Sequence, residues 1–456
     1  MLQHSFVLDA LEDTGADTFT HFEVLIEEHR QMEDCPQPSR LQQLVPTIHT
    51  FHTPLPLRKA FEVYNEKHRL TKRKHIQISF NEIRHILNLA QIMALRQGCV
   101  GLDSEESAES LANSSPNLPP ETTPCSQLQG PRLISFDGDQ TLYSDGANFE
   151  GNPQLAHYLY LLLRHGCAVA VVTAAGYEYN VEKYEYRLSG LLRYFQSRGL
   201  ATAECERFYL FGGECNYLLR LGSDYRLHPV KEFGPGGWCT STKFLPDAPA
   251  NWDDAAVQAM LDASQETAQH AVDELKLRGR VIRKKRSVGL VPNPGLEMPR
   301  ESLDEVVLRA HEKLHTMNDG TGPGLPYCAF NGGTDVWVDV GNKRVGMQVL
   351  QAYLGVPPAA SLHIGDQFLN TGNDYAARAV SPCIWIISPQ ETTYILKMIL
   401  RLSGIGVAMP EDGGAESDES LSNEKVESKP SVVDFQELER RSLAIKSMDV
   451  YTGEMK

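Results

Sequence analysis

The sequence predicts an α/β protein with a Rossmann-like, doubly wound parallel sheet, an inserted α+β domain and a helical N-terminal region. Three observations predict this fold class. An apolar run at residues 133–136 stops abruptly at two aspartates, as expected of a buried central strand. A strand, a helix and a second strand follow one another within residues 133–172, which suits one βαβ unit. Residues 201–330 interrupt this regular alternation with a mixture of strand-like and helical segments, and the alternation of strands and helices then resumes.

The composition excludes some classes of function. The chain has 456 residues, enough for two or three domains, and a formal net charge of −16. This acidity argues against nucleic acid as a partner but not against a small anionic substrate. The nine cysteines show no zinc-type spacing and indicate reduced thiols in a cytoplasmic protein. The first ten residues do not resemble a signal peptide, and no apolar run is long enough to span a membrane.

Residues 1–100 are predicted to form a helical region, although the sequence does not decide whether Met1 is the natural start. Apolar residues recur at helical spacing within Asn81–Ala94, and Ser79 is placed to cap that helix. The basic run His68–His75 fits either a solvated helix end or a contact with an anion or nucleotide. Residues 101–130 are rich in Ser, Glu and Pro and are expected to be a disordered linker.

The first part of the parallel core is expected over residues 131–200. After the first strand, residues 153–165 place leucines on one side of a helix that ends before Gly166. A second buried strand follows and ends at Thr173. The insert is expected over residues 201–332. Its predicted strands, helices and loop cover residues 208–211, 253–278, 280–291, 302–317 and 320–324.

The second part of the core is expected over residues 333–406. A helix opens at Lys343, and a later strand ends at Asp366. The predicted strands and helices of this part cover residues 334–340, 343–354, 361–365, 383–387 and 392–402. Residues 407–456 form an acidic tail that is expected to be mostly flexible, although residues 432–451 could form a helix and a strand.

Four pieces of the chain each carry a group that suits phosphoryl transfer. They are Asp137 with Asp139, the hydroxyl of Thr173, the cation of Lys343, and Asp366. The carboxyl ends of strands in a doubly wound sheet share one crevice, so these groups should converge there. Two carboxylates held close together need a cation, and hard oxygen ligands suit Mg²⁺. Each piece alone is weak evidence, because strand-end threonines are commonly structural and lysines are commonly solvated.

The ordered set resembles the haloacid-dehalogenase-like phosphatase superfamily, whose DxDxT motif matches residues 137–141. The resemblance implies that Asp137 is the nucleophile and Asp139 the general acid and base. It also implies that Asp137, the main-chain carbonyl of Asp139 and Asp366 hold Mg²⁺. Thr173 and Lys343 would stabilise the phosphoryl group, and the insert would be a cap.

The fourth motif departs from the superfamily pattern, in which a second acid follows about four residues after the first. Here the segment after Gly365 reads DQFLNTGND. Asn370, Asn373 and Asp374 are the candidates for the supporting position behind the metal ligands, and Asp374 is the favoured one.

Longer segments are similar to the IMP-specific 5'-nucleotidase family. They are FDGDQTLYSDG, LFGGECNYLLRL, FNGGTDVWVDVGNKRVGMQVLQ, HIGDQFLNTGNDYAAR and the ending MDVYTGE. The resemblance implies hydrolysis of inosine 5'-monophosphate (IMP), with Mg²⁺ as cofactor. It implies a homo-oligomer, specifically a tetramer, and ATP as an allosteric activator acting through the N-terminal region. It places Asp145 and Asp335 on the nucleoside side of the substrate, with Ser287 as a weaker candidate beside the basic run 283–286.

Two other functions stay open from the sequence. A related phosphatase could act on another nucleotide or on a sugar phosphate, because cap residues set specificity. A regulatory protein could bind nucleotides on a catalytically dead scaffold, but the intact Asp137 and Asp139 argue against it.

Overall fold

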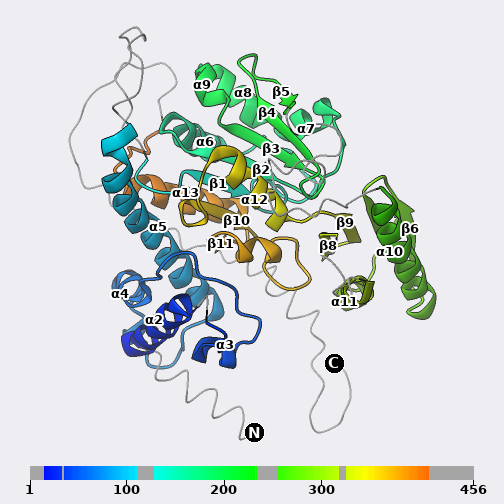
Figure 1. The fold of residues 1–456 in the computed structure, drawn as a ribbon, viewed down its shortest axis with the longest axis horizontal. Coiled ribbons are helices and arrows are strands. Elements are labelled where there is room, and N and C mark those ends of the chain that lie inside the picture. The colour runs from blue at the N-terminus through cyan, green and yellow to red at the C-terminus, as the bar shows by residue number, and fades with distance from the viewer. Residues whose placement is uncertain are drawn as a thin grey trace, which may run out of the picture. The chain divides into compact units, whose positions relative to one another are not determined.

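The computed structural model describes residues 15–32, 35–110, 128–231, 233, 254–317 and 325–409, and for residues 97–110 it describes the main chain only (Figure 1). Two sheets organise these residues. One has seven strands in the order β11-β10-β1-β2-β3-β4-β5, and the other has four strands in the order β6-β7-β9-β8.

The seven-stranded sheet is parallel from β11 to β3 and antiparallel beyond β3. Its central strand β1 is fully buried, and Leu133 pairs with Ala168 on one side and with Ser361 on the other. Strands apolar at nearly every position suit the middle of a sheet that is covered on both faces. The strands are β1 (Leu133–Phe136), β2 (Ala168–Val172), β3 (Phe208–Gly212), β4 (Tyr217–Leu221), β5 (Leu227–Pro229), β10 (Ser361–Gly365) and β11 (Cys383–Trp385).

Helices pack on both faces of this sheet. Apolar residues of α6, α8 and α13 form one core with one set of strand side chains, and α12 forms a second core with the alternate set. Asn152 and Asn342 cap α6 and α12, and the left-handed Gly355 ends α12. The helices are α6 (Pro153–Arg164), α7 (Val181–Arg187), α8 (Ser189–Ser197), α9 (Thr202–Cys205), α12 (Lys343–Leu354) and α13 (Pro389–Leu402). Short 3₁₀ turns are η3 (Pro358–Ala360) and η4 (Tyr375–Ala379).

The four-stranded sheet is antiparallel throughout, and two helices, α10 and α11, cover one of its faces. Valine and leucine side chains of β7 and β9 point into that core. The alternate side chains of the same strands point to the other face. The elements are α10 (Asp254–Glu274), β6 (Gly279–Arg283), β7 (Ser287–Pro292), α11 (Arg300–Met317), β8 (Tyr327–Asn331) and β9 (Val336–Val340).

The N-terminal region is helical where it is described, with a core of its own. The predicted helix over Asn81–Ala94 lies inside α5 and begins with the cap expected at Ser79. Ser79 Oγ accepts from Glu82 N, and Glu82 accepts from Ser79 N in return. The elements are α2 (Ala16–Gln31), α3 (Arg40–Leu44), α4 (Leu57–His68), η1 (Leu70–Lys72) and α5 (Phe80–Ser110).

The structure corrects three boundaries that the sequence suggested. Residues 208–229 were expected in the insert, with one predicted strand over 208–211, but they form β3, β4 and β5 of the large sheet. Strand β9 was expected in the second part of the core, residues 333–406, but pairs with β7 and β8 in the small sheet. The linker expected over 101–130 is helical as far as Ser110. The predicted loop 320–324, residues 111–127 and nearly all of the tail lie outside the described residues.

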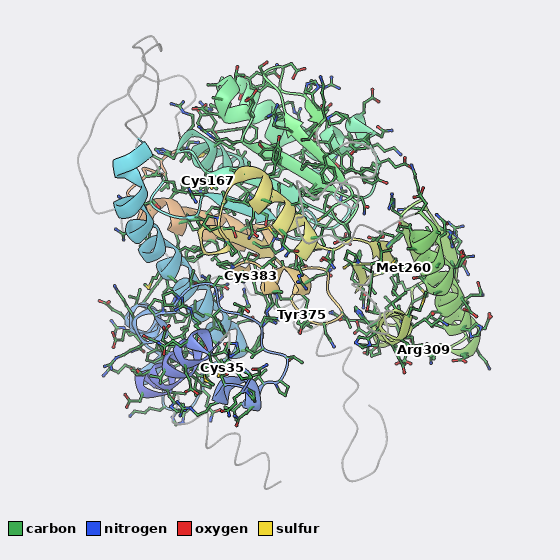
Figure 2. The ribbon with its side chains drawn as sticks, in the orientation of Figure 1. Cys35, Cys167, Met260, Arg309, Tyr375 and Cys383 are labelled. Atoms are coloured by element: carbon green, nitrogen blue, oxygen red, sulfur yellow. The ribbon has the colours of Figure 1, made fainter. Side chains whose placement is uncertain are left out.

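The thiols agree with the sequence prediction where the structure describes them. Cys35, in the loop between α2 and α3, and Cys383, at the start of β11, are free thiols (Figure 2). Within the described ranges, no helix combines the length and apolar character needed to cross a membrane.

Candidate active site

Asp137 is the first residue after β1, where the strand continues to pair with β10 through Asp137 N and Ile364 O at 2.9 Å. Its side chain is buried. Oδ1 accepts from Gly138 N at 2.7 Å and lies 2.9 Å from Lys343 Nζ. Burial raises the pKa of Asp137 to about 8, against the opposite effect of Lys343.

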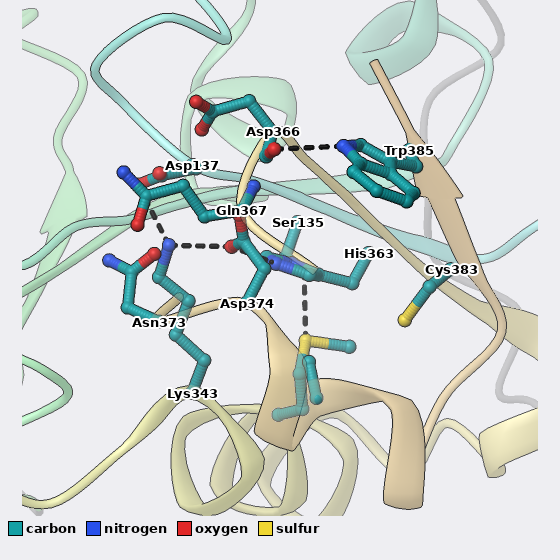
Figure 3. Close-up of polar contacts among 12 residues, drawn as sticks. Ser135, Asp137, Lys343, His363, Asp366, Gln367, Asn373, Asp374, Cys383 and Trp385 are labelled. Carbon is teal, nitrogen blue, oxygen red and sulfur yellow. Dashed lines mark hydrogen bonds and ion pairs between the residues drawn. The ribbon is translucent and has the colours of Figure 1, made fainter. Parts of the chain in front are cut away.

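Lys343 opens α12, so its ammonium group reaches the sheet from the start of a helix. Nζ lies 2.6 Å from Asp374 Oδ1, and the lysine side chain has no solvent exposure (Figure 3). Burial favours the neutral amine, but Asp137, Asp374 and Glu214 outweigh it and raise the pKa of Lys343 well above its ordinary value. The lysine is therefore a fixed cation inside the site.

Asp374, the favoured supporting acid, is fully engaged by neighbours. Oδ1 also accepts from His363 Nε2 at 2.8 Å, and Oδ2 accepts from Gln367 N at 2.9 Å. Burial favours protonation, yet Lys343 and His363 hold the pKa of Asp374 well below its usual range. Burial lowers the pKa of His363, so the ring is neutral, and its Nδ1 can accept from Ser135 Oγ at 2.8 Å.

Asp366 follows β10 and meets the other two acids. One oxygen from each of Asp137, Asp366 and Asp374 lies within 4.8 Å of the others. Burial and the two neighbouring carboxylates raise the pKa of Asp366 to about 9. Its buried Oδ1 has no hydrogen-bond partner among the described residues. A buried carboxylate oxygen without a donor, facing further carboxylates, is a donor set that fits a hard divalent cation.

Asp139 lies two residues after Asp137, in the loop that follows β1. Its Oδ1 accepts from Gly146 N at 3.0 Å and from Arg187 Nη2 at 2.5 Å. The Arg187 guanidinium also stacks over the Tyr143 ring, 4.9 Å from its centroid. A cavity of about 490 Å³ opens here, lined in part by Gly146, Tyr177 and Arg187. Arg187, the hydrogen-bond partner of Asp139, therefore lines a space large enough for a small organic substrate.

Thr173 is buried at the end of β2, as expected. Its Oγ1 accepts from Ala175 N at 3.1 Å, which fixes the hydroxyl at the strand end. A Cβ on Gly138 would lie 3.4 Å from that hydroxyl and 2.5 Å from the Tyr143 hydroxyl. Glycine at 138 thus makes room for the Tyr143 hydroxyl against the loop of the two aspartates.

The three residues expected on the nucleoside side lie on three separate segments of the chain. Asp145 is in the loop after β1. Burial raises the pKa of its carboxyl, and the nearby charge of Asp139 raises it further. Asp335 lies in the β8–β9 turn, close enough to Asp145 for their charges to interact. Ser287 begins β7 and hydrogen-bonds to Asp339, its cross-strand partner. The structure thus brings Asp145 and Asp335 together, whereas the Ser287 hydroxyl is taken by Asp339.

Ser287, Trp337 and Asp339 lie on the face of the small sheet that α10 and α11 leave uncovered. The Trp337 ring lies across Gly289, because a Cβ there would be 2.6 Å from the indole. Lys284 Nζ lies 3.9 Å from the centroid of that ring. Trp337 also hydrogen-bonds to the Asp335 carboxylate. Lys284, Trp337 and Asp335 form one connected unit, which is called the Lys284 unit below.

The family of the chain follows from comparison with known proteins. The family model described as IMP-specific 5'-nucleotidase matches residues 6–396. The chain belongs to the IMP-specific 5'-nucleotidase family.

Relatives in the IMP-specific 5'-nucleotidase family are similar along most of their length. The IMP-specific 5'-nucleotidase 1 of Plasmodium falciparum is 38% identical over 379 residues, covering 81% of this chain and 74% of the relative. The Yarrowia lipolytica protein of the same name is 36% identical over 392 residues, covering 84% of each. An IMP-bound mutant of the Plasmodium falciparum IMP-nucleotidase matches with a TM-score of 0.71 and 34% identity, covering 87% of this chain and 92% of that one. The ATP-bound structure matches with a TM-score of 0.67 and 33% identity, covering 88% and 82%.

Three residues of the site in this IMP-specific 5'-nucleotidase family member were not predicted from the sequence: Arg187, His363 and Glu214. Glu214 is fully buried in the β3–β4 turn, where it has a left-handed backbone with φ of 48°. Its Oε1 accepts from Asn373 Nδ2 at 3.0 Å, and burial raises the pKa of the carboxyl to about 8. The available signal was an acid between Gly213 and Cys215, inside the turn-like sequence GGECN.

Proposed function

We propose that the chain is a magnesium-dependent phosphatase that hydrolyses IMP to inosine and phosphate. The observation that carries the proposal is the meeting of Asp137, Lys343 and Asp366 at the carboxyl ends of one parallel sheet. The names of the relatives specify IMP, and one matched structure holds IMP. In this proposal the large sheet is a haloacid-dehalogenase-like core, and the small sheet with α10 and α11 is its cap.

Asp137 is the proposed nucleophile. Oδ1 is held by Gly138 N and Lys343, which leaves Oδ2 to attack the phosphorus atom. As this P–O bond forms, the bond from phosphorus to the ribose 5' oxygen breaks and its electron pair stays on that oxygen. The protonated Asp139 carboxyl gives its proton to the same oxygen. Inosine leaves, and Asp137 carries the phosphoryl group as an acyl phosphate.

The second half of the reaction returns both acids to their starting state. A water molecule attacks the phosphorus and gives a proton to the Asp139 carboxylate, and the bond to Asp137 breaks to release phosphate. Arg187 donates to Asp139 Oδ1 and so fixes the direction of the carboxyl, whose other oxygen would exchange the proton with the substrate and the water. Thr173 and Lys343 would neutralise charge on the phosphoryl oxygens during both steps.

Mg²⁺ would be held by Asp137, Asp366 and the main-chain carbonyl of Asp139. When bound, it supplies positive charge next to the phosphoryl oxygens. Asp374 is assigned a different task. Its oxygens already accept from Lys343, His363 and Gln367, so it fixes the lysine behind the metal site.

The nucleoside side of the substrate is proposed to lie against Asp145, Asp335 and Ser287, with the Lys284 unit reading the base. The ammonium of Lys284 can donate to the 6-oxo group of hypoxanthine, where adenine carries an amino donor instead. The Asp335 carboxylate can accept from the adjacent ring N–H of hypoxanthine. Ser287 would have to turn from Asp339 to contact the substrate.

Residues 1–100 are proposed to regulate and oligomerise the enzyme, with residues 101–130 and 407–456 as connecting and terminal segments. ATP would activate through this region in a cytoplasmic homotetramer. The support is an ATP-bound matched structure and the cationic run His68–His75. Initial rates with rising ATP at fixed free Mg²⁺, and sedimentation of the full chain, test these two points. A rate that ATP leaves unchanged at every IMP concentration contradicts the first.

The central test measures phosphate release from IMP, AMP, GMP and glucose 6-phosphate. A preference for IMP is expected, and equal rates would point instead to a broad phosphatase acting on other phosphate esters. Asp137→Asn should lower kcat by ~10³-fold or more, and the variant should still fold. The matched control is Asp224→Asn, an exposed acid paired with His228, which should leave the rate unchanged.

A further inference from the structure

Trp385 lies at the end of β11, beside the strand that ends at Asp366. Its indole Nε1 donates to the main-chain carbonyl of Asp366 at 2.8 Å (Figure 3). The ring is flanked by Phe80 and Phe368, with centroids at 5.7 Å and 6.3 Å. An indole has a single N–H donor, so its orientation is set by one partner, and here that partner is Asp366.

The main chain of Trp385 is held by the N-terminal helix α5. Asn88 Nδ2 donates to Trp385 O at 2.7 Å, and Asn88 Oδ1 accepts from Trp385 N at 3.2 Å. Arg84 Nη1 donates to the same carbonyl at 2.6 Å and pairs with Glu391. Arg84 and Asn88 are each only 4% exposed. Strand β11 is an edge strand, and these side chains bond to main-chain groups that an additional strand would otherwise pair.

The carboxylate of Asp366 is hydrogen-bonded to the main chain of the same residue. Its buried Oδ1 has no hydrogen-bond partner among the described residues. The position of this carboxylate therefore depends on its main chain, where Trp385 is bonded. Hydrogen bonds to a residue that holds a metal are known to fix the direction of its ligand atom.

We propose that Trp385 is a positioning residue that links helix α5 to the metal site. Helix α5 fixes the main chain of Trp385, and the indole fixes the main chain of Asp366, so that the placement of the Asp366 carboxylate sets the affinity for a divalent cation. The inference rests on the proposed metal role of Asp366. It adds that the N-terminal helix contributes to the metal site through Asn88 and Arg84, although neither residue contacts the three acids that could hold the cation.

The test is Trp385→Phe. This variant keeps an aromatic ring between Phe80 and Phe368 but removes the indole N–H that donates to Asp366 O. Titration calorimetry of the full chain with MgCl₂ should give a dissociation constant raised by roughly 10-fold. The turnover number at saturating Mg²⁺ should stay within about 2-fold of wild type, since no group that touches the substrate is changed. An unchanged dissociation constant for Mg²⁺ would overturn the proposal.

Tyr225→Phe is the matched control. It removes a hydroxyl that donates to Leu200 O at 3.0 Å, away from the acids, and should change only thermal stability. Asn88→Ala decides the matter if Trp385→Phe does not fold, because it loosens the Trp385 main chain and should also weaken Mg²⁺ binding. If wild type binds no Mg²⁺, the proposed metal site fails. If wild type binds it and both variants bind it equally well, only the role of Trp385 fails.

Discussion

Lys343 and Asp374 form an ion pair in which neither side chain is exposed, with Nζ 2.6 Å from Oδ1. The same ammonium lies 2.9 Å from Asp137. One cation therefore compensates two buried carboxylates, and its removal leaves both without a counter-charge. Breaking a buried pair costs far more than breaking an exposed one, because the remaining charge stays desolvated.

Lys343→Met should lower the free energy of unfolding by roughly 3–5 kcal/mol and abolish phosphate release. Urea unfolding and a phosphate assay measure the two effects. The control is Lys313→Met, whose ammonium is 46% exposed and 3.8 Å from Glu266, and which should cost less than about 1 kcal/mol. Equal losses in the free energy of unfolding for the two variants would mean that the buried ion pair stabilises the fold no more than the exposed one.

Stabilisation by Mg²⁺ should increase with pH. The pKa values of Asp137 and Asp366 are raised to about 8 and about 9, whereas both carboxyls titrate near 3.8 when unfolded. Without a cation, the folded state therefore loses stability as pH rises from about 4 toward these raised values. Mg²⁺ offsets that loss, so calorimetry should show a larger gain in Tm at pH 8 than at pH 5.5. A gain that is constant with pH, or the same in Asp366→Asn, contradicts this.

Glu214→Gln should behave like wild type near pH 4 and be the more stable of the two at about pH 8, because the pKa of Glu214 is raised on folding. The pKa of Glu214 is raised to about 8, so the folded state keeps the carboxyl neutral near pH 4, as an amide is. Because the unfolded carboxyl ionises near 4.5, wild type loses stability relative to the amide as pH rises from about 4.5 to about 8. The oxygen that accepts from Asn373 is retained in glutamine. Denaturant titrations at both pH values measure the difference, and a variant that weakens with rising pH would refute it.

Lys284→Met should reduce discrimination between IMP and AMP. Loss of a charged donor to the 6-oxo group would lower kcat/KM for IMP by ~10-fold or more, with a smaller change for AMP. The control is Lys285→Met, the next residue, which is 70% exposed and only 4.0 Å from Glu178. If both lysine variants keep the wild-type IMP to AMP ratio, the base is read elsewhere.

The parts of the site that the sequence predicted are those at strand ends. Asp137, Thr173 and Asp366 each follow a short apolar run, and β10 has the bounds expected for it. Lys343 opens its helix as expected, because Asn342 supplies the cap before it. Local patterns carry this information, and the parallel topology brings the ends together.

What the sequence did not predict depends on pairing between distant residues. Strand β9 is apolar enough to resemble a central parallel strand, and only its pairing with β7 places it in the small sheet. Residues 217–229 were assigned to the insert, and only their antiparallel pairing beyond β3 places β4 and β5 in the large sheet. Arg187 reaches Asp139 from a helix with no motif of its own. Contacts between residues far apart in the sequence produce no periodic pattern in the local sequence from which they could be predicted.

The order of pairing around β1 also bears on how the chain is made. Leu133 meets Ala168 soon after both leave the ribosome, whereas its other partner, Ser361, emerges only after the whole small sheet. Until then, β1 is an apolar strand with one unpaired edge, the kind of segment that joins other chains. Synthesis that stops before residue 361 yields a product that lacks Asp366 and is prone to aggregate, and a pause in translation ahead of β10 extends the time for which the nascent chain needs a chaperone.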